Sequence, residues 1–267
     1  NASSTPHAVI EGNQPFAEMG ACASAGDVNG DGYSEIIVGA QGFDLGSTDE
    51  GAAFLCRGSA LGILSIPSET FHSNQAGAHF GRAVASAGDV NGDGYSDIVI
   101  GANLFDNGQN DEGVAMVYHG DTEGIRNTEN AVMLSNQDNG EMGTCVASAG
   151  DLNGDGYSDL ICSARYYDNG EYDEGAAFVY YGSALGLDTI AAVILECNQV
   201  EAHFGWSVAS AGDVNGDGYS DVIVGARIWD GTQVDEGAAF IFHGSATGLS
   251  STPAARLEIG QAGAWFG

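Results

Sequence analysis

The residues best suited to chemistry in this sequence lie in the segment GDVNGDGYSE at residues 26–35. Oxygen-bearing side chains occupy positions 1, 3, 5 and 9 of a loop that starts at Asp27, and Gly32 occupies position 6. A spacing of two directs alternate side chains into a curled backbone, and glycine tolerates the positive φ of a sharp turn. Because Ca²⁺ prefers about six to eight oxygen ligands, the segment is either a plain surface turn or a calcium loop.

Nearly the same string returns three more times along the chain, and the first aspartates of successive copies are 62 residues apart. In each copy we expect the side chains at positions 1, 3, 5 and 9 and the tyrosine carbonyl at position 7 to be the ligands. The four expected sets are Asp27, Asn29, Asp31, Tyr33 and Glu35; Asp89, Asn91, Asp93, Tyr95 and Asp97; Asp151, Asn153, Asp155, Tyr157 and Asp159; and Asp213, Asn215, Asp217, Tyr219 and Asp221.

The alternative interpretation is that Asp, Asn and Gly simply form turns, as a single string of this kind often does. Turn formation does not explain the carboxylate at position 9, and three carboxylates in one tight loop repel one another without a cation. The sequence therefore favours about four calcium ions, one per repeat, over Mg²⁺, which demands strict octahedral geometry. Glu35 is one methylene longer than the aspartates at its equivalent positions, so we expect the first site to differ most in affinity.

Composition limits the classes of partner. The chain has 267 residues, 42 of them glycine, and only six cationic side chains against 37 acidic ones, which gives a formal net charge of −31. Such a surface repels nucleic acid and anionic membranes, and favours cations or cationic partners. Adaptation to high salt would also produce it. No apolar run approaches the length of a membrane span, and NASSTPHAVI is not a signal peptide.

Each 62-residue unit alternates four short apolar runs with clusters of Gly, Asp and Asn, which predicts four strands, A to D in chain order. Strand B is apolar throughout, as in IVIG at residues 98–101, so we expect both of its faces to be covered. The predicted fold is an all-β propeller region over 1–267 with four-stranded antiparallel blades. The expected boundaries are an outer strand of a preceding blade at 1–12, repeats at 13–73, 74–135, 136–197 and 198–259, and the start of a further repeat at 260–267.

Two short motifs carry a specific resemblance. HFG stands at 79–81 and 203–205 and WFG at 265–267, with EMG at 18–20 and 141–143, while VGA, IGA, CSA and VGA end the four B strands. The chain therefore resembles the FG-GAP repeat family, which builds the propeller of integrin α subunits. The resemblance implies the same calcium loops and a closed form of seven blades, so we expect part of a longer propeller. A closed four-bladed ring and a ring completed by two chains are the alternatives.

A second acidic string separates strands B and C, for example FDNGQNDEG at 105–113. Antiparallel strands place these loops on the face opposite the metal loops. A solvated turn is the favoured interpretation of them, and a rim that binds a partner is the alternative. The partner itself, a protein or a glycan, is expected on this opposite face, and the open edges of the propeller could allow self-association.

The sequence offers no other clear metal or catalytic cluster. No histidine has a Cys or His partner at ligand spacing, so packing is favoured over zinc binding. Pairing strands A and B about their loop places Cys162 opposite Ser148, away from Cys145, and we expect all five thiols to be mostly buried. The five are Cys22, Cys56, Cys145, Cys162 and Cys197.

We therefore predict a non-catalytic, calcium-binding adhesion or ligand-binding module, with no nucleic-acid binding and no membrane insertion. Shallow loops of this type should bind Ca²⁺ with a Kd of about 10⁻⁴ to 10⁻³ M, which favours an extracellular or cell-surface setting. The alternatives are a structural spacer in a repetitive surface protein, a non-catalytic domain of a secreted hydrolase, and an enzyme with acidic residues and histidines near the central channel.

Overall fold

The computed structural model describes residues 8–267, in which all regular structure is β-strand. The strands form four antiparallel sheets of four strands each, and within each sheet the strands follow one another in chain order. Each sheet lies within one expected repeat. The strands are β1 Met19–Gly26, β2 Glu35–Ala40, β3 Ala52–Cys56 and β4 Glu69–His72; β5 Phe80–Gly88, β6 Asp97–Ala102, β7 Val114–Tyr118 and β8 Ala131–Leu134; β9 Met142–Gly150, β10 Asp159–Ala164, β11 Ala176–Tyr180 and β12 Val193–Leu195; and β13 Phe204–Gly212, β14 Asp221–Ala226, β15 Ala238–Phe242 and β16 Ala255–Leu257.

The second strand of each sheet is covered on both faces, as its continuous apolar run predicts. All six residues of β6 and all six of β10 are buried. The short outer strands are more open, and every residue of β16 is exposed. Burial is therefore highest in the second and third strands of each sheet.

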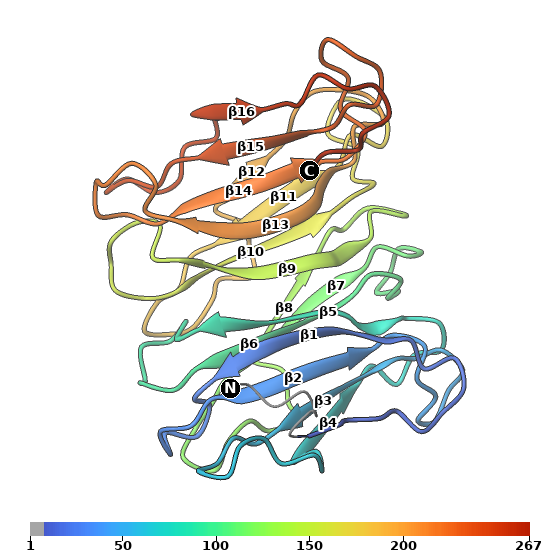
Figure 1. Ribbon diagram of the computed structural model, residues 1–267, viewed down its shortest axis with the longest axis vertical. Helices are drawn as coiled ribbons and strands as arrows, with labels where there is room; N and C mark the ends of the chain where they lie inside the picture. Colours follow the sequence, from blue (N-terminus) through green and yellow to red (C-terminus); the bar gives the residue numbers. More distant parts are fainter. Residues whose placement is uncertain (1–7) are drawn as a thin grey trace, which may run out of the picture.

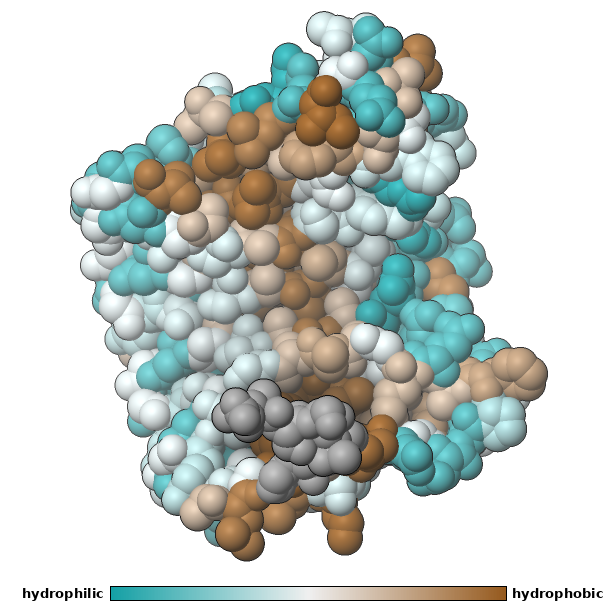
Figure 2. Space-filling model, in the orientation of Figure 1, coloured by the Kyte–Doolittle hydropathy of each residue, from teal (hydrophilic) through white to brown (hydrophobic). Residues whose placement is uncertain are grey.

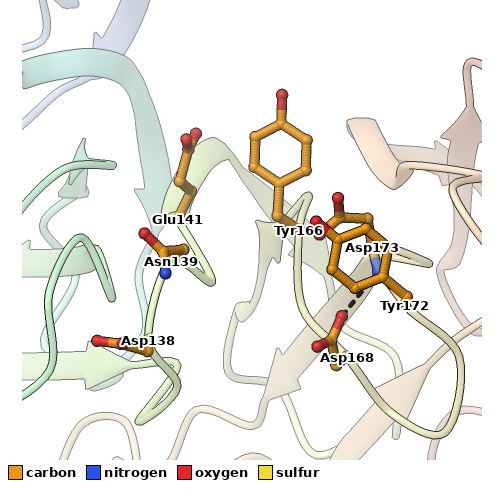
Figure 3. A pocket seen from close by; sticks show the side chains of 7 residues that line it. All are labelled: Asp138, Asn139, Glu141, Tyr166, Asp168, Tyr172 and Asp173. Carbon is orange, nitrogen blue, oxygen red and sulfur yellow. Dashed lines mark hydrogen bonds between the residues drawn. The ribbon is translucent and has the colours of Figure 1, made fainter.

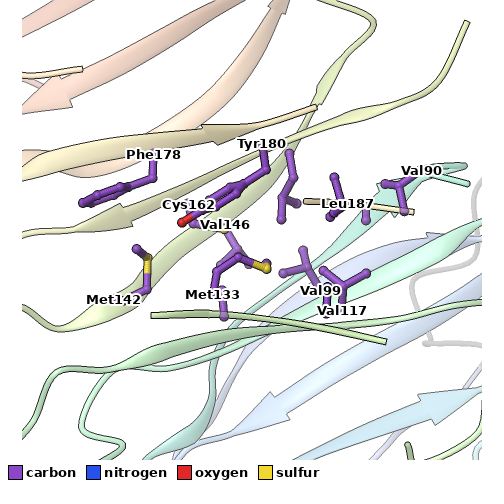
Figure 4. Packing of buried hydrophobic residues seen from close by; sticks show 14 of the residues in the cluster. Val90, Val99, Val117, Met133, Met142, Val146, Cys162, Phe178, Tyr180 and Leu187 are labelled. Carbon is purple, nitrogen blue, oxygen red and sulfur yellow. The ribbon is translucent and has the colours of Figure 1, made fainter. Parts of the chain in front are cut away.

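The four sheets stack face to face in chain order, from β1–β4 at the bottom of Figure 1 to β13–β16 at the top. The first strands of successive sheets, β1, β5, β9 and β13, contact one another in that order. Apolar side chains fill the spaces between sheets; Val99, Met133, Val146 and Phe178 belong to the cluster between the second and third (Figure 4). Within residues 8–267, the first and fourth sheets share no substantial contact. Four-stranded antiparallel sheets stacked in this way are the blades of a propeller.

Apolar and hydrophilic residues separate along the strands. On the face shown in Figure 2, the apolar band runs through the middle of the stack, and hydrophilic residues gather at the sides where the loops lie. The structure includes, over residues 8–267, no helix of the length and apolar character that crossing a membrane requires.

The glycines of the FG and GA motifs allow adjacent blades to touch through their backbones. A Cβ atom on Gly39 would collide with the carbonyl oxygen of Gly81 in the next blade. Gly81 itself has a φ of +82°, and a Cβ there would meet the carbonyl oxygen of Ala52. No residue with a side chain fits this contact without displacing one blade.

Backbone hydrogen bonds join adjacent blades close to this contact. The Phe80 amide donates to the carbonyl of Glu50 at 3.0 Å, and the Met142 amide donates to that of Glu112 at 2.9 Å. Phe204 and Phe266 make the equivalent bonds to Glu174 and Glu236 at 2.7 and 3.0 Å. Residues 265–266 therefore occupy the place that begins a blade elsewhere, although residues 260–267 form no strand.

Three expectations need correction or restriction. Cys162 pairs with Val146 and not with Ser148, because register shifts interrupt the pairing of β9 with β10. Cys22 is exposed on β1, whose outward face has no neighbouring sheet among the described residues. The outer strand expected over residues 1–12 is absent from 8–12, and residues 1–7 lie outside the described part of the chain.

Candidate metal centre and the opposite face

The four candidate calcium loops, residues 27–35, 89–97, 151–159 and 213–221, are called loops 1 to 4. Each curls around the carboxylate of its first aspartate. In loop 2, Asp89 Oδ1 accepts hydrogen bonds from the amides of Gly92 at 2.7 Å and Asp93 at 3.1 Å, and its Oδ2 accepts one from Gly94 at 2.9 Å. The same three bonds recur in loops 1, 3 and 4, with Asp27, Asp151 and Asp213 as acceptors.

Positions 3 and 5 of each loop complete a set of oxygen donors at the surface. Asn91 Oδ1 accepts the Asp93 amide at 3.0 Å, and Asp93 Oδ1 accepts the Tyr95 amide at 3.0 Å. Asp89 Oδ2 and Asp93 Oδ1 each accept one N–H group, so each keeps a lone pair for a cation. Two carboxylates and one amide oxygen in a single turn are the hard donors that Ca²⁺ takes, so positions 1, 3 and 5 fit this ion.

The position-9 carboxylate lies beneath the loop. Asp97 is fully buried, and its Oδ2 accepts the Val90 amide at 2.8 Å while its Oδ1 accepts the Gly120 amide at 2.9 Å. Asp159 and Asp221 make the equivalent pairs of bonds. These bonds engage both oxygens of the Asp97 carboxylate, and over residues 8–267 no three acidic, His or Cys side chains converge as metal ligands. Position 9 thus has a clear structural role in addition to the expected role as a ligand.

Glu35 replaces aspartate in loop 1 without loss of this arrangement. Its Oε2 accepts the Val28 amide at 3.0 Å and its Oε1 accepts the Gly58 amide at 3.2 Å. The extra methylene is therefore accommodated within the buried space below the loop. The expectation that site 1 differs in affinity stays a prediction.

Burial and neighbouring charge disfavour the anionic form of the position-9 carboxylates in loops 2 and 3. Desolvation is the main cause that raises the pKa of Asp97 to about 7; the charges of Asp93 and Asp89 act in the same direction, and the two amide bonds oppose them. The pKa of Asp159 is raised to about 7 for the same reasons. A cation in the loop would offset the repulsion among these carboxylates.

The acidic string on the opposite face is built around a buried glutamate. We call residues 44–50, 106–112, 168–174 and 230–236 the DEG loops. Glu112 is 1% exposed, and its Oε1 accepts the amides of Asn107 at 2.6 Å and Gln109 at 3.3 Å. The Asp106 carboxylate accepts the Asp111 amide at 2.7 Å. The interpretation of a solvated turn is therefore wrong for the glutamates, which close these loops from inside.

A pocket of about 350 Å³ opens on this face between the second and third blades (Figure 3). Its walls come from the connection that precedes β9 and from the third DEG loop. Four carboxylates and two phenol rings dominate the lining, which comprises Asp138, Asn139, Glu141, Tyr166, Asp168, Tyr172 and Asp173. One carboxylate is neutralised, because Arg165 Nη2 lies 2.7 Å from Glu141 Oε2 and the guanidinium also covers the Tyr166 ring. The pocket therefore carries a net negative charge.

Hydrogen bonds and burial fix much of the pocket wall. The Asp173 amide donates to Asp168 Oδ1 at 2.7 Å, the dashed line in Figure 3. Burial raises the pKa of Asp173, and a hydrogen bond to Tyr172 partly opposes this. Beside the pocket, His203 packs against the Tyr166 ring, with 4.9 Å between centroids, and burial lowers its pKa.

Comparison of equivalent positions, 62 residues apart, distinguishes the residues that recur in every repeat from those that occur only at this pocket. Asp168 and Asp173 have counterparts in every DEG loop. Tyr172 does not, since Asn110 and Val234 occupy its equivalent positions, and Asp138 corresponds to Ala76 and Val200. This pocket was not predicted from the sequence, although the positions that break the repeat are visible there.

Comparisons with other proteins agree with the geometry. The family described as FG-GAP repeat matches residues 20–56, 80–118, 146–180 and 204–242. The chain is 32% identical over 245 residues to integrin alpha-5 of Xenopus laevis, which covers 88% of the chain and 22% of that protein. It is 34% identical over 226 residues to integrin alpha pat-2 of Caenorhabditis briggsae, covering 78% of the chain and 18% of that protein. It is 30% identical over 217 residues to integrin alpha-V of Gallus gallus, covering 78% and 20%. The chain thus spans about a fifth of the length of these relatives.

Proposed function

The chain belongs to the FG-GAP repeat family, and on that premise we propose that it is a non-catalytic, calcium-stabilised module that binds a cationic partner outside the cell. Calcium is proposed to stabilise the blades at loops 1 to 4. A partner is proposed to bind on the face formed by the DEG loops. The single observation that carries the binding role is the negatively charged pocket between the second and third blades.

The calcium part of the proposal rests on the donor set of each loop. The side chains at positions 1, 3 and 5 would hold the ion, with position 9 and the position-7 carbonyl as the remaining candidate ligands. Bound Ca²⁺ would supply positive charge among the carboxylates of each loop. Loops of this shallow kind are expected to bind at about 10⁻⁴ to 10⁻³ M, a range that extracellular calcium reaches, and the integrin relatives support the same setting.

The binding part rests on residues that interrupt the repeat. Asp138, Tyr166 and Tyr172 line the pocket, and none of them is required to close a DEG loop elsewhere in the chain. Carboxylates beside aromatic rings attract a guanidinium or ammonium group through charge and through the faces of the rings. A protein that presents an arginine or lysine side chain fits this pocket better than a neutral glycan.

Calcium binding is tested by thermal unfolding. We expect EGTA to lower the Tm by many degrees and added Ca²⁺, but not Mg²⁺ at equal concentration, to restore it. An unchanged Tm in EGTA would remove the calcium part of the proposal and leave the pocket untouched.

Partner binding is tested with N-acetyl-arginine amide as the probe, added to ¹⁵N-labelled protein in saturating Ca²⁺. We expect shifts of the amides of Tyr166 and Tyr172. Replacing Tyr172 by the residue of the fourth blade, in Tyr172→Val, should weaken binding several-fold, while Val234→Ala is the matched control in that blade. Shifts spread evenly over all acidic loops would show that only general charge attraction is present, which contradicts a specific site.

A further inference from the structure

We infer that loops 1 to 4 bind calcium as a coupled row, in which the tyrosine and serine at positions 7 and 8 of one loop are positioning residues for the loop before it. The inference rests on the proposed calcium binding and adds an interaction between sites. Its basis is a set of contacts between neighbouring loops that are made by the tyrosine rings, the serines and the amide and carbonyl groups of the position-1 aspartates, none of which is a candidate ligand atom.

Ser158 of loop 3 holds the main chain of the first ligand residue of loop 2. The Ser158 amide donates to the carbonyl of Asp89 at 2.9 Å, and the Asp89 amide donates to the Ser158 hydroxyl at 3.2 Å. Both backbone polar groups of Asp89 are therefore bound by one residue of the next blade. Ser96 and Ser220 donate their amides to Asp27 and Asp151 at 3.0 and 2.9 Å, so each junction between loops has this link.

The tyrosine before each of these serines covers the preceding loop. A Cβ atom on Gly92, at position 4 of loop 2, would lie 2.5 Å from Cε1 of Tyr157. The equivalent distances are 2.8 Å from Gly30 to Tyr95 and 2.6 Å from Gly154 to Tyr219. At position 4 of loops 1 to 3, a side chain would therefore collide with the aromatic ring of the next blade.

The covering tyrosine is itself held by a candidate ligand of its own loop. The Tyr157 amide donates to Asp155 Oδ1 at 3.1 Å, and Asp155 is at position 5 of loop 3. Order at Asp155 is thus transmitted to Tyr157 and Ser158, and from them to Gly92 and Asp89. The path from one donor set to the next consists of direct contacts.

A further bond runs between the blades at position 2. The Ser183 amide of the third blade donates to the Val90 carbonyl at 3.0 Å, and Val90 is also tied to Asp97 through its amide. Val90 is fully buried and Leu152 equally so, whereas Val214 of loop 4, which no following loop covers in the described structure, is 52% exposed. Cover by a neighbouring blade therefore changes the environment of a loop within this one chain.

Coupling of this kind has a thermodynamic signature. If calcium in loop 3 orders Asp155 and its neighbours, loop 2 loses less conformational freedom when it binds its own ion, and its affinity rises. The effect is reciprocal, so loop 2 must raise the affinity of loop 3 by the same factor. A coupling factor of about five or more is the expected range.

The test is a calcium titration of ¹⁵N-labelled protein that follows the position-6 glycine amides, Gly32, Gly94, Gly156 and Gly218, as separate reporters of the four loops. Tyr157→Ala, which keeps the carbonyl of loop 3, should weaken loop 2 about fivefold or more. Tyr157→Phe retains the ring and should leave loop 2 unchanged. Tyr33→Ala is the matched control, because no loop precedes Tyr33 in the described structure.

The reciprocal arm uses Asp93→Ala and Asp155→Ala, which disable loops 2 and 3 in turn. Each should weaken calcium binding at the other loop by the same factor, with both variants folded as judged by their remaining glycine signals. Equal affinities at loop 2 in Tyr157→Ala and the parent, or no mutual effect of the two aspartate variants, would overturn the coupling. Absence of calcium shifts at every loop of the parent would instead contradict the proposed function.

Discussion

The carboxylate of Asp97 ties the Gly120 amide, 2.9 Å from Oδ1, to the foot of loop 2. We expect Asp97→Asn to destabilise the protein by about 1–3 kcal/mol even in EGTA. The asparagine side chain has a nitrogen in place of one carboxylate oxygen, so one of the two buried main-chain N–H groups loses its acceptor. Urea unfolding in EGTA measures this. Asp93→Asn, on the exposed side of the loop, should cost less than about 0.5 kcal/mol under the same conditions. Equal losses in the two variants would show that position 9 has no separate structural role.

Calcium should stabilise the chain by mass action. A site with free Ca²⁺ at about ten times its Kd contributes about 1.4 kcal/mol, so four such sites contribute about 6 kcal/mol. Asp155→Ala, which disables loop 3, should reduce the calcium-dependent increase in the free energy of unfolding by at least the contribution of one site. Urea unfolding with and without Ca²⁺ measures this increase. A gain that is unaffected by this substitution would place the stabilising ion elsewhere.

The buried glutamates of the DEG loops should be important for stability and irrelevant to calcium. Glu112→Ala leaves the amide of Asn107 without its acceptor inside the loop, and we expect a cost of about 2–3 kcal/mol. Glu112→Gln keeps an acceptor oxygen and should cost less. Calcium titrations of both variants should match the parent, and a weakened loop 2 in Glu112→Gln would contradict the separation of the two faces.

Thiol reactivity should follow burial. Cys22 is exposed, whereas Cys56 and Cys162 are buried and burial raises the pKa of both thiols. We expect one fast-reacting thiol per native chain with a disulfide reagent, and reaction of Cys56 and Cys162 only on unfolding. Cys22→Ser should abolish the fast phase, so a fast phase that persists in this variant would contradict the packing.

The free energy of unfolding should depend on pH, in part through His203. Burial lowers its pKa in the folded state, so below about pH 6.5 the unfolded chain binds a proton that the folded chain does not. The stability that neutral His203 gives is present at pH 7.5 and is lost as the pH falls towards the lowered pKa. Asparagine tolerates the φ of 51° at this position, so His203→Asn is a suitable variant. Its loss of unfolding free energy relative to the parent should be smaller at about pH 5.5 than at about pH 7.5. A difference in unfolding free energy that is constant with pH would contradict this.

The architecture could be predicted from the sequence because the repeat is strict. The 62-residue spacing and the four apolar runs per unit led to four antiparallel sheets, and both were confirmed. The pairing of Cys162 could not be predicted in the same way, since β-bulges displace the register after the loop and leave no mark in the hydrophobic pattern. Exposure of Cys22 depends on which sheet covers β1, which is a property of the stack and not of the strand.

The candidate calcium loops were located from the spacing of their residues, whereas the structural role of position 9 was not predicted. A carboxylate that binds two backbone amides has the same sequence signature as a metal ligand, and only the burial of Asp97 separates the two roles. The pocket was missed for a different reason. The repeat was recognised from residues that recur every 62 positions. Asp138 and Tyr172 do not recur, so the repeat pattern did not mark them as residues of a site.

The links between blades occur at both ends of the strands. Ser96 is bonded to Asp27 at the end that carries loops 1 to 4, and Phe80 is bonded to Glu50 at the other end. Two blades joined at both ends of their strands cannot pivot apart about one end. They also cannot slide past each other without breaking both rows of hydrogen bonds. A pull applied across the stack would be shared between the two rows, so adjacent blades would separate only when the bonds at both ends of the strands break.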